Sequence, residues 1–498
     1  MHKSTGDRPV RRSVLSILPT GTAWGVSPAV SACYLPRMHF EADAGSASDR
    51  ERVPLQQMAL RDAYLPGAAR LAWSADRLAA ERQRRLRELL TRAAERSPYW
   101  RQRLTGRDLP SFTEADLPSL PILTRDEMME NFDRLITVPG LTRARVSQYV
   151  EQAGADRYLA GGYRAIKTSG ANGVEALHLY GWDAFVTFVM QGSRWTGRRG
   201  EPRGVVFAEL FSSSPMHESG IFEAFTAFQS GAPRTHWLSG GSPLPELVAA
   251  LNDAEPRVDG LQGWPSTIRL LALEAMAGRL EITPSWVSVA GEVCSPLVNE
   301  AVRAAWGLEL SEFWGCSEGT YAFPCGVGEG MHIADDLVIL EPVDAQGKVV
   351  PYGQPADRVL LTNLFNLDQP LIRYDLADAM TIIDAPCPCG CAHRRIADIR
   401  ARADGVLDYS GGALVPRREI ETMLLACPGV AEFFVQQTDA GADVSVVTHG
   451  SYDAEALRTN LVALLARRGV TAPQVRLQEI DTPPRLWSDK AQQFAPTP

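Results

Sequence analysis

Hydrophobic positions recur with two different periods along the chain. Between residues 51 and 135 they recur at helical spacing, and the arginine-rich stretch 81–103 carries its leucines on one face. Breaks rich in proline and aspartate around residues 107–128 separate these helices, and Ser97-Pro98 ends one of them. An amphipathic helix with a solvated basic face explains the arginines better than a ligand-binding surface does.

From about residue 160 onward, apolar strands alternate with helices. The segments "RGVVFAEL" (203–210) and "SWVSVAG" (285–291) are predicted strands that end at polar or glycine turns. The segments "SPLPELVAALNDA" (242–254) and "SPLVNEAVRAAWG" (295–307) are predicted helices. This alternation predicts an α/β fold whose large domain has mainly parallel or mixed sheets covered by helices. Ligands of such sheets bind beyond the carboxyl ends of the strands.

The elements become shorter after about residue 403. Helices and strands alternate there as a helix, two strands, a longer helix and a last strand, at residues 416–429, 430–437, 444–450, 453–469 and 474–480. This pattern predicts a small, mobile α+β domain. We therefore expect a disordered leader at residues 1–50, a large domain at 51–402 and a small C-terminal lid domain at 403–498.

Composition and charge narrow the class of protein. The 498 residues are too many for one hydrophobic core, and 45% hydrophobic with 22% charged residues is typical of globular chains. A net charge of −9 argues against a nucleic-acid-binding surface. No apolar run is long enough to span a membrane, and the apolar stretch of the leader is broken by Pro19, Gly21 and Gly25. We expect a cytoplasmic protein that binds neither nucleic acid nor membranes.

Several turns after predicted strands carry candidate chemistry. The loop "TSGANG" (168–173) offers hydroxyl and N–H groups to an anion, because glycine lets the chain curl close to a phosphate. Taken alone, it is explained equally well as an ordinary turn. Gly291-Glu292 ends one predicted strand, and "SEFWGCSEG" (311–319) repeats that pattern with an acid at Glu318. A right-handed crossover between two such strands would bring these turns side by side as the floor of a cleft.

The order of these segments resembles that of the adenylate-forming superfamily, and most closely its phenylacetate–CoA ligase-like branch. "TSGANG" is similar to the phosphate loop of that family, "VAGEV" and "FWGCSEG" to its adenine and magnesium turns, and "PLIRYDLAD" to its ribose-binding segment. "RARADGVL" resembles its interdomain hinge, and "PPRLWSDKAQQ" (483–493) resembles its C-terminal lysine motif. The resemblance covers about residues 60–495, with six motifs in the same order.

The resemblance implies a role for each matching residue. The residues expected to bind ATP are Thr168, Ser169, Gly170, Gly173, Gly291, Glu292, Trp314, Gly315, Ser317, Asp378 and Arg402. Among them Trp314 would stack on or border the adenine, and Asp378 would accept the ribose hydroxyls. Glu318 would bind Mg²⁺, Asp404 would be the hinge, and Lys490 would bridge the carboxylate and the α-phosphate. A lysine and a metal aimed at two reacting anions lower the barrier to their reaction.

Two departures from the family pattern bear on activity. The phosphate loop has Ala171 and Asn172 followed by Val174-Glu175, where the family carries further hydroxyls and a lysine. Gly405 replaces an acid beside the hinge. Fewer hydroxyls and an added acid near the phosphates would weaken ATP binding, so an inactive homologue is an alternative to an enzyme.

The cysteines are unevenly placed, which favours metal or chemistry over disulfides in a reducing compartment. Cys325, His332, Cys387 and Cys389 offer three thiolates and one imidazole, a closed set that satisfies tetrahedral Zn²⁺. Zinc at matching positions is also common in the branch that the chain resembles. Cys391 or His393 could replace one ligand, and the alternative to a structural zinc site is a set of inert thiols. Cys316 lies inside the adenine turn and is expected to be a small packing residue.

The acid that would be activated is less constrained by the sequence. Phe211, His217, Glu218 and Trp264 lie where the family lines its acyl pocket, although His217 and Glu218 facing solvent is equally favoured. The resemblance implies ATP-dependent activation of a small aromatic carboxylic acid as an acyl-adenylate, followed by transfer to CoA. The alternatives are transfer to an amine or a carrier protein, and a non-catalytic binding protein. The expected cofactors are ATP, Mg²⁺ and structural Zn²⁺, with CoA as co-substrate, and a homodimer is compatible with the resemblance.

Overall fold

A computed structural model describes most of the chain. The described residues are 49–152, 158–169, 175–195, 206–214, 217, 235–400, 405–486 and 488–495. Every described residue lies in one compact unit, within residues 42–498. The predicted leader at 1–50 therefore falls almost entirely outside the described residues.

The first described part is helical, as its hydrophobic period predicts. Its α-helices are α1 (Asp49–Ala69), α2 (Ala75–Arg96), α3 (Pro98–Leu104), α4 (Arg125–Glu130), α5 (Phe132–Leu135) and α6 (Arg143–Gln152), with short 3-10 helices at Arg70–Ala72 and Glu114–Ser119. Helix α2 buries one leucine-rich face, and its arginines lie on the more exposed side, several of them paired with glutamates. Ser97 ends α2 and caps α3 by accepting a hydrogen bond from the Trp100 N–H (3.2 Å), which confirms the predicted break.

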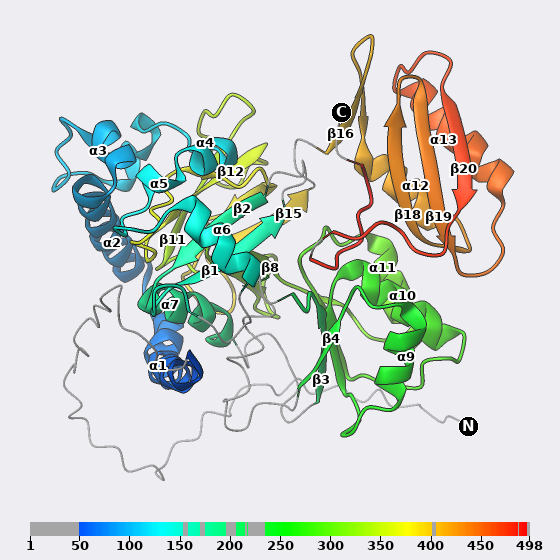
Figure 1. Cartoon of the computed structure of the whole chain (residues 1–498), viewed down its shortest axis with the longest axis horizontal. Helices are drawn as coiled ribbons and strands as arrows, with labels where there is room; N and C mark the ends of the chain where they lie inside the picture. Colours follow the sequence, from blue (N-terminus) through cyan, green and yellow to red (C-terminus); the bar gives the residue numbers. More distant parts are fainter. Residues whose placement is uncertain are drawn as a thin grey trace, which may run out of the picture. The chain divides into compact units, whose positions relative to one another are not determined.

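A five-stranded parallel sheet follows, in the order β4-β3-β5-β6-β7. Its strands are β3 (Phe207–Phe211), β4 (Thr235–Ser239), β5 (Gly260–Gly263), β6 (Trp286–Val289) and β7 (Ser311–Glu312). The helices α9 (Leu244–Asn252), α10 (Pro265–Met276) and α11 (Pro296–Trp306) pack their apolar residues against it around Leu261 and Val287 (Figure 1). This confirms the predicted alternation, because each parallel connection requires a crossover.

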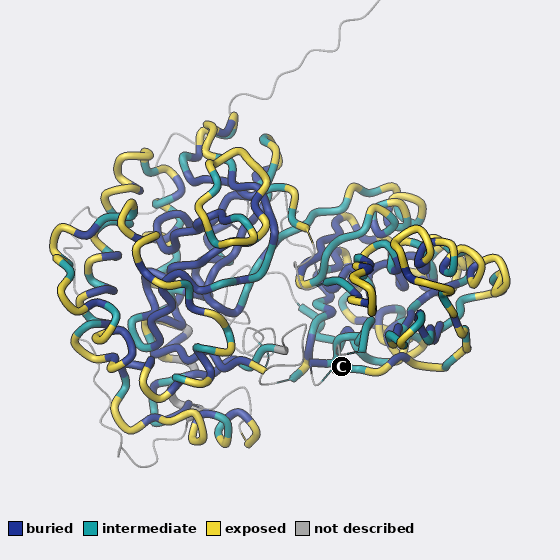
Figure 2. The backbone as a smooth tube through the Cα atoms, turned by 90° about the horizontal axis from the view of Figure 1, so that it is seen from above, coloured by how far each residue is buried: buried dark blue, intermediate teal, exposed yellow. Residues whose placement is uncertain are grey.

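The remaining sheets of the large part are antiparallel. The hairpin β1 (Arg164–Ser169) and β2 (Glu175–Tyr180) precedes helix α7 (Trp182–Ser193). A second sheet has the order β14-β15-β10-β9-β8, with β8 (Trp314–Cys316), β9 (Thr320–Pro324), β10 (Met331–Ile333), β14 (Ala379–Ile383) and β15 (Arg395–Arg400). A third contains β11 (Val338–Val343), β12 (Arg358–Asn363) and β13 (Tyr374–Asp375). Buried residues follow these strands, and exposed ones follow the outer helices (Figure 2).

The C-terminal elements match the sequence prediction closely. The strands β16 (Val406–Tyr409) and β17 (Ala413–Pro416) form a hairpin, and β18 (Val430–Thr438), β19 (Gly441–Thr448) and β20 (Gln474–Glu479) form a sheet. Helices α12 (Arg417–Ala426) and α13 (Ala454–Arg467) pack on this sheet around Phe433 and Leu461. This part therefore has an apolar core of its own.

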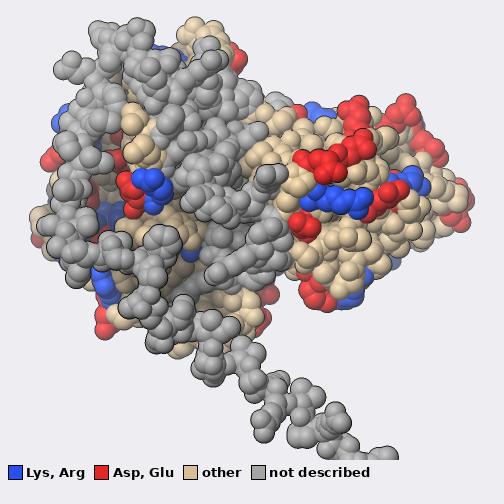
Figure 3. All heavy atoms as spheres, turned by 90° about the horizontal axis from the view of Figure 1, so that it is seen from below, with Lys and Arg blue, Asp and Glu red and all other residues tan. Residues whose placement is uncertain are grey.

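Two findings concern surfaces. Among the described residues, no helix combines the length and the apolar character that a membrane span requires. Figure 3 shows acidic and basic side chains close together on the described part of one face.

Candidate functional site

The carboxyl ends of the parallel strands bring together residues that are far apart in the sequence. Phe211 ends β3, Trp264 follows β5, Gly291 follows β6 and Trp314 follows β7. Strands β6 and β7 are direct neighbours, with Val289 paired to Glu312. The two turns that the sequence predicted to lie side by side are therefore adjacent, at the edge where sheets of this type bind ligands.

The C-terminal lysine reaches this edge. The Lys490 ammonium donates a hydrogen bond to the Gly291 carbonyl oxygen and lies 5.9 Å from the centre of the Trp264 ring. Gly291 has φ of +80°, a left-handed conformation that favours glycine. A side chain at this position would also approach Trp264 to 3.3 Å. The structure thus places Lys490, Gly291 and Trp264 together, although they come from three distant segments.

Glu292 has a local role at the same turn. Its carboxylate accepts a hydrogen bond from the Ser266 N–H (3.1 Å) at the start of α10, where the helix dipole favours a negative charge. The charge of Glu292 also acts on Glu421 of α12, since burial and Glu292 together raise the pKa of Glu421 to about 7. Glu292 is therefore part of the electrostatic environment where α12 approaches the large part.

Trp314 and Asp378 are joined directly. The Trp314 indole N–H donates to the Asp378 carboxylate over 3.3 Å, which links the predicted adenine and ribose residues. The approach to Asp378 contains two non-glycine residues with left-handed backbone, Arg373 at φ +53° and Ala377 at φ +58°. Arg373 is fixed by its guanidinium, which donates to the buried Glu341 carboxylate (3.0 Å). Backbone strain of this kind persists where surrounding contacts over-determine a conformation, and it is concentrated at functional sites.

Glu318, the predicted magnesium ligand, lies in a buried group of charges. Its side chain is about 5% exposed, and one carboxylate oxygen lies 3.7 Å from both an Arg125 guanidinium nitrogen and His178 Nε2. These distances exceed hydrogen-bond length, so neither pair is a direct hydrogen bond. The backbone is held more tightly, because the Asn363 amide donates to the Glu318 carbonyl (2.9 Å) and Tyr180 donates to the Ser317 carbonyl (2.5 Å).

His178 is a residue that the sequence prediction missed. It lies on β2, is fully buried and has neither ring nitrogen hydrogen-bonded among the described residues. Burial lowers its pKa to about 4, the charge of Glu318 opposes this shift, and Arg125 reinforces it. Thr168 lies on the same face of the hairpin, two pairs along, and its buried hydroxyl is likewise without a partner among the described residues. Polar groups buried in this way require an explanation in a native structure.

The predicted phosphate loop is described only at its edges. Ser169 ends β1 and Glu175 begins β2, so the loop connects the two strands of a hairpin. Lys167 and Glu175 form an ion pair (2.6 Å) across its base. Gly170 and Gly173 lie outside the described residues, and so do Glu218, Arg402 and Asp404.

The predicted acyl-pocket residues lie partly together. The rings of Phe211 and Trp264 meet edge to face, with centroids 6.2 Å apart. Desolvation and the charge of Lys490 lower the pKa of His217 to about 4, while Asp489 acts in the opposite direction. Phe211, Trp264, His217 and Lys490 therefore surround one region at the ends of β3 and β5.

The four predicted zinc ligands converge. Cys325 follows β9, His332 lies in β10, and Cys387 and Cys389 lie between β14 and β15. One ligand atom from each of these residues lies within 4.8 Å of the other three, and Cys325, His332 and Cys387 are buried. The Sγ atoms of Cys325 and Cys387 are 3.6 Å apart, and Cys389 Sγ is 3.3 Å from His332 Nε2. The arrangement of these side chains can hold a metal ion.

Surrounding groups orient the cluster. His332 Nδ1 hydrogen-bonds to the His393 carbonyl oxygen (2.7 Å), so this nitrogen carries the proton and Nε2 faces the sulfurs. Trp195 stacks on the His332 ring at 5.4 Å. Burial raises the pKa of the Cys325 thiol, but hydrogen bonds from the backbone of Gly328 and Val327 and from the Cys387 and Cys389 side chains together outweigh it, so the pKa is lowered overall. The His393 ring is engaged elsewhere, with Nε2 3.1 Å from the Arg70 carbonyl oxygen.

Comparisons with known proteins add to this geometry. No protein-family model matches the sequence, and no curated protein sequence matches it. Among solved structures, the chain is similar to 2-hydroxyisobutyryl-CoA ligase in the postadenylation state, in complex with R3-HIB-AMP. The TM-score is 0.63 and the sequence identity is 18%, and the match covers 86% of this chain and 91% of that chain. The chain has the fold of the adenylate-forming ligases. The thioesterification state of the same ligase, in complex with 2-HIB-AMP and CoA, gives a TM-score of 0.53 and 18% identity, over 85% of this chain and 90% of that chain.

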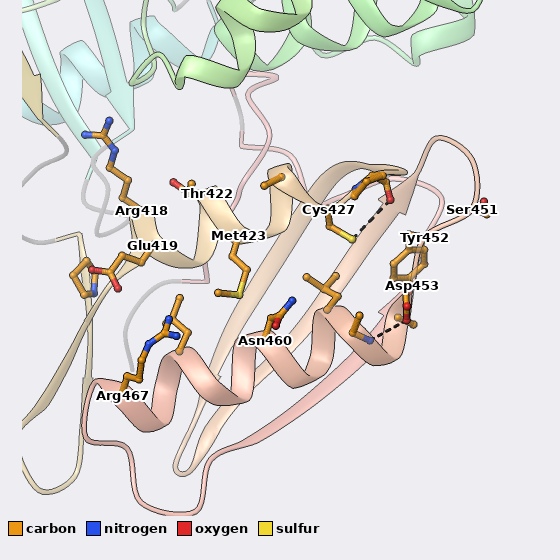
Figure 4. A pocket seen from close by; sticks show the side chains of 17 residues that line it. Arg418, Glu419, Thr422, Met423, Cys427, Ser451, Tyr452, Asp453, Asn460 and Arg467 are labelled. Atoms are coloured by element: carbon orange, nitrogen blue, oxygen red, sulfur yellow. Dashed lines mark hydrogen bonds between the residues drawn. The ribbon is translucent and has the colours of Figure 1, made fainter.

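Within this adenylate-forming ligase fold, a separate groove lies in the C-terminal part. It runs between α12 and α13, has a volume of about 1250 Å³ and is lined by Met423, Cys427 and Asn460 among other side chains (Figure 4). No residue that the sequence predicted for catalysis, nucleotide binding or metal binding lines it. We therefore assign the groove no part in the candidate site.

Proposed function

We propose that this chain is an ATP-dependent, AMP-forming acid ligase, which activates a small carboxylic acid as an acyl-adenylate and transfers the acyl group to CoA. The observation that carries the proposal is the meeting of Lys490, Gly291 and Trp264 at the carboxyl ends of the parallel strands. The fold shared with 2-hydroxyisobutyryl-CoA ligase, which was solved in the postadenylation state in complex with R3-HIB-AMP, supports it.

The chemistry follows from the charges of the reactants. A carboxylate oxygen of the acid attacks the α-phosphorus of ATP, the new P–O bond forms, and the bond to pyrophosphate breaks. Both reactants are anions, so the Lys490 ammonium between the carboxylate and the α-phosphate stabilises the developing charge. When bound at Glu318, Mg²⁺ would supply further positive charge at the phosphates. The buried Glu318 carboxylate, 3.7 Å from His178 Nε2 on β2, has the oxygen ligands that this ion prefers.

Residues on the large part would hold the nucleotide. Asp378 would accept the ribose hydroxyls while Trp314 fixes its carboxylate. Gly291, Glu292, Gly315 and Ser317 would line the adenine side. The phosphate loop would contribute Thr168, Ser169, Gly170 and Gly173, and Arg402 would approach from the hinge. These assignments rest on the resemblance together with the positions described above.

The C-terminal residues 403–498 would act as a lid that rotates at Asp404. The higher TM-score with the postadenylation state than with the thioesterification state supports an arrangement close to the former. A lid that carries the lysine assembles the site for the first half-reaction and can withdraw it for the second. Residues 51–402 would then form the ATP- and acid-binding domain.

The cysteine cluster would hold a structural zinc ion. A tetrahedral site with Zn–S of about 2.3 Å and Zn–N of about 2.0 Å has its sulfurs about 3.8 Å apart and each sulfur about 3.5 Å from the nitrogen. The observed separations of 3.6 Å and 3.3 Å are close to these values. Four protein ligands leave no open position, so the ion would stabilise the loops after β9 and β14 and take no part in the reaction.

The acid is proposed to be small and aromatic. The edge-to-face pair of Phe211 and Trp264 supports this, since an aromatic ring in the substrate would find two ring surfaces there. His217 would contribute a polar contact as a neutral imidazole, because its pKa is about 4. Glu218 belongs to the same predicted pocket.

Pyrophosphate release with a panel of carboxylic acids tests the proposal. We expect release with at least one small aromatic acid, followed by thioester formation when CoA is added. If pyrophosphate is released but only an amine or a carrier protein accepts the acyl group, the adenylation is correct and the acceptor is wrong. Absence of pyrophosphate release with every acid, from a folded protein that binds zinc, would favour a non-catalytic binding protein.

A further inference from the structure

Asp489, the residue before the lysine, is bound by the large part of the protein. One of its carboxylate oxygens accepts hydrogen bonds from the Ser213 N–H (3.2 Å), the Ser213 hydroxyl (3.1 Å) and the Ser239 hydroxyl (3.0 Å). Ser239 ends β4 and Ser213 follows β3, and these strands are parallel neighbours with Phe211 paired to Ser239. The carboxyl ends of two adjacent strands thus form a cradle for one carboxylate.

The backbone of Asp489 has an uncommon conformation that serves this contact. Its φ is +64°, in the left-handed region that glycine adopts most easily. A tight turn holds it there, because the Asp489 N–H donates to the Leu486 carbonyl and the Leu486 N–H donates to the Lys490 carbonyl, both over 2.9 Å. A position whose backbone favours glycine therefore carries a side chain, and that side chain is the one that binds the cradle.

The partner surface is shaped to admit the turn. A Cβ atom on Gly241 would lie 2.3 Å from the Asp489 carbonyl oxygen and 2.6 Å from the Asp489 Cβ. Contacts under about 3.0 Å between such atoms require one side to move, because both belong to the backbone or lie next to it. The loop after β4 thus contributes a hydroxyl at Ser239 and an open space at Gly241 to the same contact.

The turn is anchored at its other end to the small sheet. Residues 484–486 and 488–495 belong to a hairpin in which Arg485 pairs with Ala491, and the end of this hairpin runs beside β18. The Val435 N–H donates to the Gln493 carbonyl, and the Ala495 N–H donates to the Val435 carbonyl, both over 2.9 Å. Phe494 also packs edge to face on Phe433. The hairpin therefore moves with the small sheet, while its tip at Asp489 and Lys490 contacts the large part.

We propose that Asp489 is a positioning residue that holds the lysine turn against the strand ends for the adenylate-forming half-reaction. This inference rests on the proposed function. The Lys490 ammonium must exchange its contact with the Gly291 carbonyl for contacts with the reactants, so Lys490 cannot itself keep the turn in place during the reaction. Asp489 can, because its contacts are to Ser213 and Ser239 of the large part, neither of which is assigned to the reactants in the proposed function.

The test compares two substitutions at Asp489 with two at its partner Ser239. Asp489→Gly removes the carboxylate and leaves the left-handed turn unstrained, whereas Asp489→Ala removes the carboxylate and adds strain. Ser239→Ala removes one donor, and Ser239→Thr keeps the hydroxyl as its matched control. Because three hydrogen bonds to a charged acceptor are lost, we expect Asp489→Gly to slow pyrophosphate exchange by on the order of tenfold to a hundredfold. Ser239→Ala should have a smaller effect in the same direction, and Ser239→Thr should have almost none.

Two further measurements separate positioning from a general loss of structure. The transfer of a supplied acyl-adenylate to its acceptor should be unchanged or faster in Asp489→Gly, since the lid is released more easily. Hydrogen exchange of the peptide amides in 484–495 should be at least about tenfold faster in Asp489→Gly than in the native chain without any substrate.

The outcomes can be assigned unambiguously. Faster hydrogen exchange in 484–495 in Asp489→Gly, together with a loss confined to the first half-reaction, supports the proposal. If the native protein releases no pyrophosphate with any acid but its hairpin still depends on Asp489 for protection, the proposed function fails and the contact stands. Unchanged hydrogen exchange and unchanged pyrophosphate exchange in Asp489→Gly would overturn it, and so would equal losses in both half-reactions.

Discussion

Replacing Gly328 by alanine should prevent binding of the proposed zinc ion with little direct strain on the backbone. Gly328 lies in the loop after Cys325, and its φ is outside the left-handed region. An added Cβ would lie 2.5 Å from Cys387 Sγ and 3.2 Å from both an Arg395 guanidinium nitrogen and Pro388 Cδ. Alanine is therefore acceptable to the backbone at this position but collides with a proposed zinc ligand.

The expected magnitude follows from these distances. Non-bonded heavy atoms settle at roughly 3.5–4.0 Å, so the sulfur must move by about 1 Å or more. Metal–ligand distances tolerate deviations of only about 0.2 Å, so a displacement of that size removes Cys387 from the coordination shell. Structural Zn²⁺ binds with about 10–16 kcal/mol, and an equal share for one of four ligands is about 3 kcal/mol, on the order of a hundredfold in affinity.

Gly326→Ala is the matched control, because it lies two residues away and has the opposite properties. Its φ is +69°, and an added Cβ would meet no atom within 4 Å. It should lower the free energy of unfolding by about 1–2 kcal/mol through backbone strain and keep its zinc. The assay is zinc content per chain after exposure to a competing chelator, with thermal unfolding measured in parallel. If Gly328→Ala retains as much zinc as Gly326→Ala does, the assignment of the cluster as a zinc site is wrong.

The other predictions concern the reaction and its pH dependence. Glu318→Ala should slow adenylate formation by on the order of a hundredfold or more, measured as pyrophosphate exchange, and Asp378→Ala should raise the ATP concentration that exchange requires. Lys490→Ala should slow adenylate formation by on the order of a hundredfold with normal folding, while transfer from a supplied adenylate suffers much less; equal losses would argue against a moving lid. The pKa of Glu421 is raised to about 7, so protonated Glu421 adds to the free energy of unfolding of the native chain. This contribution is fully present below the ordinary pKa near 4.5 and is lost as the pH rises through about 7. The free energy of unfolding of Glu421→Gln relative to the native chain should therefore increase between about pH 5 and about pH 8, and a constant difference would contradict this.

The strand ends and the four candidate metal ligands could be predicted because each is marked by residues that are close together in the sequence. An apolar run that stops at Gly291-Glu292 marks a strand end, and period-2 and period-3.6 patterns locate the elements between the turns. Cys325, His332, Cys387 and Cys389 are recognisable because three thiolates and an imidazole fall within two short segments of the sequence. Lys490 was found through its motif, and its contact with the Gly291 carbonyl then emerged only from the fold.

The residues that the sequence prediction missed have contacts that only the tertiary structure reveals. In the sequence, His178 is one polar position in an apolar strand. No neighbouring residue indicates that its ring is buried, with Nε2 3.7 Å from a Glu318 carboxylate oxygen. Arg125 begins a short helix and resembles the many solvated arginines near it. Asp489 looks like a surface acid beside a lysine, and its role depends on two serines about 250 and 276 residues away. These contacts depend on burial and on pairing between distant segments, and neither produces a periodic pattern in the sequence.

The hairpin at residues 484–495 has a consequence for the solubility of the protein. Strand β18 is an outer strand of its sheet, and such edges expose unpaired N–H and C=O groups that can recruit a second chain. Val435 satisfies part of that edge by pairing with the hairpin next to Phe494. A truncation that removed the lysine motif would therefore also expose unpaired N–H and C=O groups on the edge strand β18. Chains that lost this hairpin would be prone to self-association, so the segment that carries the proposed catalytic lysine also protects an edge strand from pairing with a second chain.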